Sequence, residues 1–153
     1  MKYLIILILT LSSALLFSQD LRQKAPKGTM YIDIIKEGSK EQLYNELTEW
    51  LLDKGFMIEF RDSELFLIRT EPFERGSHMS YYTFRIKDGI ITISGNYRQS
   101  SSSVALWGTG FNARDSFQQI KNVSSMQITG VKGAYRDMQI VAELLGDKLV
   151  FRK

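Results

Sequence analysis

The stretch YYTFRIKDGIITISGN, residues 81–96, decides the fold class. At its centre, Asp88-Gly89 is typical of a two-residue type I′ hairpin turn, because both positions of that turn need a positive φ. Counting outward from the turn gives one apolar face: Ile86 opposite Ile91, Phe84 opposite Ile93, and Tyr82 opposite Gly95. The other face is largely polar: Arg85 opposite Thr92, Thr83 opposite Ser94, and Tyr81 opposite Asn96. The stretch therefore predicts an antiparallel hairpin with one buried face.

A second hairpin is predicted directly upstream of this one. Phe56, Ile58 and Phe60 alternate with more polar positions, as expected for a half-buried strand. A tight turn at Asp62-Ser63 would then place Phe60 opposite Leu65 and Ile58 opposite Leu67. Joined in sequence, the two hairpins predict a four-stranded antiparallel meander.

A helix is predicted immediately before the meander. Ser39 and Gln42 have the spacing of a capping box, and Gly55 stands where a left-handed C-terminal cap is expected. Between these ends, apolar residues recur at helical spacing: Leu43, Leu47, Trp50 and Leu51. Because Trp50 shares this stripe, we interpret it as a core residue rather than a ligand-stacking one.

The flanking segments complete an α+β order. Residues 30–36 (MYIDIIK) predict a first strand, and residues 149–151 a short last one. A second helix is predicted from about 134 to 145, ended by Gly146, with one apolar face made by Tyr135, Met138, Val141, Ala142 and Leu145. The expected order is β-α-β-β-β-β-α, with both helices on one face of the sheet.

Residues 99–133 form a Ser/Gly-rich insertion without sustained periodicity. We expect short strands near 104–107 and 125–129. The segments GTG (108–110) and GVKG (130–133) lack the spacing and the Lys-Ser/Thr ending of a phosphate loop, and we interpret them as turns.

The first 19 residues predict a cleavable signal peptide. Lys2 precedes an uncharged apolar run, residues 3–17, that suits a signal peptide better than a membrane-spanning helix of about 20 residues. Cleavage is expected near Gln19, with Ser12-Ser13-Ala14 as an alternative site; an uncleaved N-terminal anchor is the other interpretation. A polar, mobile lead-in (20–29) and a single domain (30–153) would follow.

The amino-acid composition limits which anchors and partners the protein can have. The chain has no cysteine, so neither a lipidated Cys after the leader nor a disulfide is available. Without Lys2, 19 basic residues face 17 acidic ones, a net charge of +2 that is too small to indicate nucleic acid or an anionic membrane. We expect an exported protein, periplasmic or secreted, with no stable membrane span once the leader is removed.

The capped helix SKEQLYNELTEWLLDKG (39–55), together with the element order, resembles a group of exported bacterial proteins of unknown function. Their domain has a TATA-binding-protein-like (TBP-like) fold. The shared features are Ser39, Lys40, the Leu43-Tyr44 pair and Trp50, and the resemblance covers about residues 30–145. The Ser/Gly-rich insertion departs from the family pattern. The resemblance implies a fold and an envelope location, and it brings no catalytic residues.

The sequence offers little for catalysis or metal binding. His78 is the single histidine, and with no cysteine a zinc site is not expected. We predict no cofactor and no catalytic residue, with His78 exposed at the start of a strand. The alternative is a small carboxylate-based hydrolase or glycan-processing enzyme using Glu59, Asp62 or Glu64. A solvated ion pair, with Arg61 opposite Glu64, also accounts for that cluster.

The outer sheet face is predicted to carry more apolar side chains than a solvated face should. The residues in question are Phe66, Ile68, Met79 and Tyr81, with Arg85 beside them. Either Trp107 and Phe111 of the insertion fold back over this face, or it binds an envelope protein, a second copy or a stacking ligand. The sequence therefore favours a non-enzymatic envelope binding module over the hydrolase.

Overall fold

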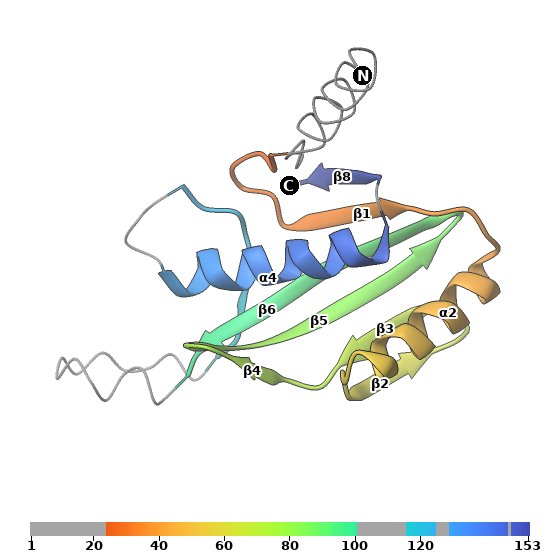
Figure 1. Ribbon diagram of the computed structural model, residues 1–153, viewed down its shortest axis with the longest axis horizontal. Helices are drawn as coiled ribbons and strands as arrows, with labels where there is room; N and C mark the ends of the chain where they lie inside the picture. Colours follow the sequence, from red (N-terminus) through yellow and green to blue (C-terminus); the bar gives the residue numbers. More distant parts are fainter. Residues whose placement is uncertain (1–23, 101–115, 125–128, 147) are drawn as a thin grey trace, which may run out of the picture.

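The computed structural model describes residues 24–100, 116–124, 129–146 and 148–153. These residues form an open antiparallel sheet of eight strands with two helices, so the α+β prediction is confirmed (Figure 1). The predicted signal peptide lies outside the described residues. The elements are β1 (Tyr31–Ile35), α2 (Lys40–Asp53), β2 (Ile58–Asp62), β3 (Leu67–Thr70), β4 (Phe73–Arg75), β5 (His78–Lys87), β6 (Ile90–Gln99), β7 (Gln118–Gln119), α4 (Thr129–Leu145) and β8 (Leu149–Arg152).

The strands follow the order β2-β3-β5-β6-β1-β8, with β4 paired to β5 and β7 paired to β6. Strands β2, β3, β5 and β6 therefore make the predicted meander, and β1 lies between β6 and β8 (Figure 1). The predicted last strand is confirmed as β8, which pairs with β1 antiparallel. This pairing places the two ends of the domain side by side.

The β5–β6 hairpin has the predicted register throughout. Its turn residues, Asp88 (φ 46°) and Gly89 (φ 76°), both have the positive φ of a type I′ turn. The expected pairs Ile86–Ile91, Phe84–Ile93 and Tyr82–Gly95 are all present. Each strand is ten residues long, so this hairpin sets which side chains face the core across most of the sheet.

Helix α2 begins and ends as predicted. The Ser39 hydroxyl accepts from the Gln42 backbone N–H at 3.2 Å, while the Gln42 side chain donates forward to Glu46 instead of back to the cap. At the other end, Gly55 (φ 79°) donates to Leu52 O, and the next N–H, of Phe56, donates to Leu51 O. These two bonds form a Schellman motif, which positive φ at glycine makes inexpensive.

The predicted register of the first hairpin is wrong. The strands pair Asp62 with Leu67 and Arg61 with Ile68, around a four-residue turn, and the register shifts between Ile58 and Phe60. The Asp62 carboxylate accepts from the backbone N–H groups of Glu64 and Leu65, at 2.9 Å each. An Asx turn of this kind needs more residues than the tight turn that we expected.

Helix α4 starts at Thr129, five residues before the expected start. Its predicted apolar face is buried as expected, but GVKG (130–133) is helix rather than turn. A Cβ at Gly130 would meet Tyr97 and Gln99 at 3.6 Å, and one at Gly133 would meet His78 at 3.4 Å. The glycines lie where the helix passes close to β5 and β6, and tertiary packing outweighs their low helix propensity.

Two short strands, β4 and β7, were not predicted. The strand expected near 125–129 is wrong at Thr129, which is helical, and residues 125–128 lie outside the described residues, as do 104–107. Part of the expected mobile lead-in is described: the Asn122 side chain donates to the carbonyls of Ala25 and Pro26, and Thr29 is buried. Residues 25–29 therefore contact the segment after β7.

One hydrophobic core lies between the sheet and the two helices, which cover the same face (Figure 1). The largest fully buried side chains come from the strands, from both helices and from the residue after β7: Tyr82, Phe84, Ile32, Ile34, Leu43, Leu47, Leu51, Ile68, Ile91, Ile93, Ile120 and Met138. Trp50 packs at the edge of this core, stacked on Phe56 with ring centroids 6.4 Å apart. The opposite sheet face carries no helix among the described residues.

Candidate functional site

The face of the sheet opposite the helices, called here the outer face, is built by alternation along β5 and β6. Because successive strand residues point to opposite faces, burying Tyr82, Phe84 and Ile93 turns their neighbours outward. The outer face carries Met79, Tyr81, Thr83, Arg85 and Lys87 from β5, and Thr92, Ser94, Asn96 and Arg98 from β6. Aromatic, basic and hydroxyl side chains are therefore mixed on one open surface.

An aromatic and arginine cluster occupies the β4 end of the outer face. Phe117, just before β7, packs edge-on against Tyr81 with ring centroids 5.0 Å apart. The Arg98 guanidinium lies 5.0 Å from the centroid of the Phe117 ring and donates to Met79 Sδ at 3.3 Å. A cation held over an aromatic face loses less of its freedom on binding a partner than a free arginine would.

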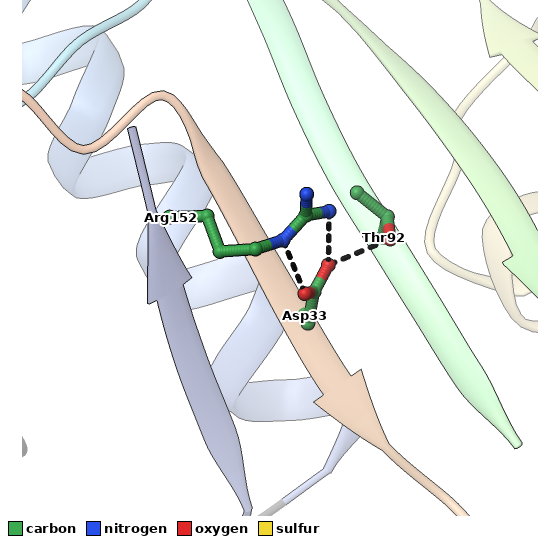
Figure 2. A network of polar contacts seen from close by, with 3 residues as sticks. All are labelled: Asp33, Thr92 and Arg152. Carbon is green, nitrogen blue, oxygen red and sulfur yellow. Dashed lines mark hydrogen bonds and ion pairs between the residues drawn. The ribbon is translucent and has the colours of Figure 1, made fainter.

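A polar network crosses the other end of the outer face (Figure 2). Asp33 of β1 receives two hydrogen bonds from Arg152 of β8, one of them from Nη2 to Oδ1 at 2.8 Å, and one from the Thr92 hydroxyl at 2.6 Å. The Arg152 guanidinium also lies 5.5 Å from the Tyr31 ring centroid. This network links three neighbouring strands through their side chains.

Electrostatics keep Asp33 ionised. Burial works to raise the pKa of this carboxyl, but hydrogen bonds from Arg152 and Thr92, with the arginine charge, outweigh it. The net result is a pKa for Asp33 below its ordinary value. The Asp33 carboxylate therefore neutralises the charge of Arg152. The network at this end of the outer face joins strands and does not present an unpaired cation.

Charge at the centre of the outer face is less balanced. Arg69 of β3 forms an ion pair with Glu59 of β2, with Nε and Oε2 2.9 Å apart, and it also lies 5.9 Å from the Phe60 ring centroid. Arg85, which pairs with Leu67 and lies diagonal to Arg69, is exposed and forms no ion pair with a described residue. The centre of the outer face thus presents a free guanidinium between hydroxyl side chains.

Three of the predicted site residues lie on the outer face: Met79, Tyr81 and Arg85. Two were placed wrongly. Ile68 is fully buried in the core, and Phe66 adopts φ 49° in the turn before β3, with its ring edge-on to Tyr44 of α2 at 5.9 Å. Both errors follow from the wrong register of the first hairpin.

Trp107 and Phe111, the other two predicted site residues, lie outside the described residues. Sequence reasoning missed Phe117, which comes from the same insertion and packs on Tyr81. It also missed the Asp33–Arg152 pair. The only available signal for that pair was an aspartate inside the apolar strand MYIDIIK, which requires a partner wherever the strand is central.

The prediction that His78 is exposed is wrong, because it is only 5% exposed and points into the core. Its Nε2 lies 3.3 Å from Asp137 Oδ2 of α4, and Arg75 Nε lies 3.8 Å from the other oxygen of that carboxylate. The neighbouring hydroxyls of Ser80 and Tyr82 are buried and have no hydrogen-bond partner among the described residues. No nucleophile among these residues is hydrogen-bonded to the histidine, so the cluster lacks the geometry of a triad.

The carboxylates considered for catalysis have separate structural contacts. Glu59 pairs with Arg69, Asp62 caps the turn, and Glu64 is exposed within that turn. The prediction that Arg61 lies opposite Glu64 is wrong, since Arg61 pairs with Ile68. The three carboxylates therefore have three different local environments.

The described part of the chain shows neither a metal centre nor a membrane-spanning helix. In the described ranges, no group of three or more His, Cys, Asp or Glu side chains is placed to hold a metal ion. None of the helices of this part of the chain is long and apolar enough to cross a membrane. No protein-family model matches the chain, and no curated protein is found to be similar to it.

Proposed function

We propose that this protein is an exported, non-enzymatic binding module of the bacterial envelope, and that its outer face binds a partner protein. The observation that carries the proposal is the composition of the outer face. An open sheet face carries tyrosine, methionine and arginine side chains while both helices pack on the opposite side. Export rests on the predicted signal peptide and on the resemblance to exported proteins with a TBP-like domain.

The residue types of the outer face are those of protein interfaces. Tyrosine, methionine and arginine are enriched at the centres of such interfaces, and tyrosine and arginine carry much of the binding energy. Here Tyr81 and Arg98 are already held against Phe117, which reduces the entropy lost on binding. Arg85 supplies a charge that no described residue neutralises and that an acidic group of a partner would match.

Two variants test the outer face. Tyr81→Ala and Arg85→Ala remove an anchor and a free charge from exposed or half-exposed positions, so we expect each domain to stay folded. Each variant should lower recovery of a crosslinked partner from the native envelope by about tenfold, the effect of losing one interface anchor. Fractionation of the same material would locate the protein in the cell.

Arg136→Ala is the matched control, because Arg136 is an exposed arginine of α4 on the helical side of the molecule. It should leave partner recovery unchanged. The proposal is contradicted if all three variants recover the same partners in equal amounts while circular dichroism shows that each remains folded.

A further inference from the structure

A cleft of about 310 Å³ opens between α2 and α4, on the side of the sheet opposite the outer face. Three buried side chains give it an apolar floor: Leu47 of α2, Leu145 of α4 and Ile91 of β6. Trp50 and Leu144 line it further out, and Leu144 is 62% exposed. The cleft is large enough for a small organic molecule and offers its carbon atoms an apolar surface.

The polar lining of this cleft is predominantly acidic. Among the described residues that line it, Lys36 is the single cation, and its Nζ lies 2.9 Å from Glu46 Oε2. The other carboxylate oxygen of Glu46, Oε1, accepts from Gln42 Nε2. The other two lining carboxylates, Glu49 and Asp53, are exposed and form no ion pair with a described residue. Three carboxylates and one ammonium leave the lining with two uncompensated negative charges.

The position of Asp53 is unfavourable for the helix that carries it. Asp53 is the last residue of α2, whose final turn has no basic residue, while Lys54 follows at the C-cap and Glu49 lies one turn earlier. The carbonyl end of a helix is the negative end of its dipole, where lysine or arginine stabilises and aspartate destabilises. Helix stability alone would therefore select other residues here, and a bound cation would offset the repulsion.

Trp50 adds a second kind of cation recognition. Trp50 follows Glu49 and precedes Asp53 in the sequence, and it also lines the cleft. Its ring stacks on Phe56 at an interplanar angle of 21°. That stacking fixes the ring orientation. The face of an indole ring attracts organic cations more strongly than do other aromatic side chains.

We propose that the α2–α4 cleft binds an organic cation: an amine or quaternary ammonium group attached to a small apolar body. The ammonium group contacts Trp50 and the carboxylates of Glu49 and Asp53, and the apolar body rests on the floor formed by Leu47 and Ile91. Because the cleft and the outer face lie on opposite sides of the sheet, this site is independent of partner binding at the outer face.

Benzyltrimethylammonium is a suitable probe, because it joins a quaternary ammonium group to one small aromatic ring. In a Trp107→Phe background, the tryptophan fluorescence reports Trp50 alone. We expect a saturable change in this fluorescence on titration with benzyltrimethylammonium, and a much weaker response to neutral benzyl alcohol or to anionic benzoate. Equal responses to all three compounds, or no response to the cation, would overturn the proposal.

Two charge-matched double variants separate the cleft from general electrostatics. Glu49→Gln with Asp53→Asn removes both free carboxylates and should weaken binding of the probe by about fivefold, while raising the Tm because the dipole repulsion is lost. Glu37→Gln with Glu41→Gln removes the same charge from exposed positions outside the cleft and should leave probe affinity unchanged. Equal affinity in the two double variants would refute a role for the cleft carboxylates.

Discussion

At Asp33, a carboxylate that is 8% exposed stands inside an otherwise apolar strand. The sequence predicts this strand from its β-branched and aromatic residues, but it contains no local sign of the partner. Arg152 lies 119 residues away, and only the pairing of β1 with β8 brings the two side chains together. Contacts of this kind depend on topology, so residue-scale prediction fails where the partner is distant in sequence.

The pH dependence of stability should report the Asp33 network. The pKa of Asp33 lies below its ordinary value in the folded protein, so ionisation of this carboxyl stabilises the fold above about pH 4. This contribution is lost as the pH falls through the folded-state pKa. Asp33→Asn should lower the free energy of unfolding by about 1–3 kcal/mol at neutral pH and much less at low pH. Urea denaturation at a series of pH values measures both effects.

Glu64→Gln is the control for this experiment, because Glu64 is an exposed carboxylate in the turn before β3 and forms no ion pair with a described residue. The free energy of unfolding of Glu64→Gln should stay close to that of the original protein at every pH. If Asp33→Asn lowered the free energy of unfolding equally at low and neutral pH, the asparagine would be disturbing packing rather than removing a stabilising charge.

At the scale of elements, turn and cap residues correctly predicted the hairpin register and the helix ends that they determine locally. Asp88-Gly89 set the β5–β6 register, and Ser39 and Gly55 set the ends of α2. The predictions failed where distant contacts decide the outcome. Helix α4 extends through Gly130 and Gly133 because the close approach to β5 and β6 outweighs propensity.

The junction of β6 and β7 depends on the absence of a side chain at Gly95. A Cβ at this position would lie 2.8 Å from Ile120 Cδ1 and 2.9 Å from Tyr82 Cδ1, both in the core. Gly95→Ala should therefore lower the free energy of unfolding by about 1–3 kcal/mol, the usual cost of overpacking. Thermal or chemical denaturation followed by circular dichroism measures it.

Gly130→Ala is the comparison for this glycine. A Cβ at Gly130 would meet its nearest neighbours at 3.6 Å, which is ordinary contact. We expect this helical variant to be no less stable than the original protein and up to about 1 kcal/mol more stable, because alanine has the higher helix propensity. If Gly95→Ala were also not destabilising, Ile120 would have to move away from β6 without loss of packing.

Across the whole molecule, the sequence indicated the layers but only part of the candidate site. Alternation along β5 placed Met79, Tyr81 and Arg85 correctly, because the hairpin register was right. Phe66 and Ile68 were misplaced because a turn that is held by a side chain changed the register. The cleft between α2 and α4 was not predicted, since its lining comes from two helices that are far apart in sequence and meet around it only in the folded chain.

Asn122 joins segments that are far apart in the chain. Its Nδ2 donates to Ala25 O at 2.8 Å and to Pro26 O at 3.0 Å, while its backbone N–H donates to Thr29 O and its carbonyl accepts from Gly28 N. One side chain thus holds the segment before β1 against the segment after β7. This arrangement closes the end of the sheet at which β1 begins.

Substitution of Asn122 should consequently destabilise the fold in a way that depends on hydrogen-bond donors. Asn122→Ala removes both donors and should cost about 1–2 kcal/mol in the free energy of unfolding. Asn122→Asp keeps the shape but turns a carboxylate oxygen toward two carbonyl oxygens, so it should cost more than alanine at neutral pH and less in acid. Asn45→Ala, at an exposed site of α2, should be nearly neutral. Urea denaturation of the three variants would contradict this account of Asn122 if aspartate were tolerated better than alanine at neutral pH.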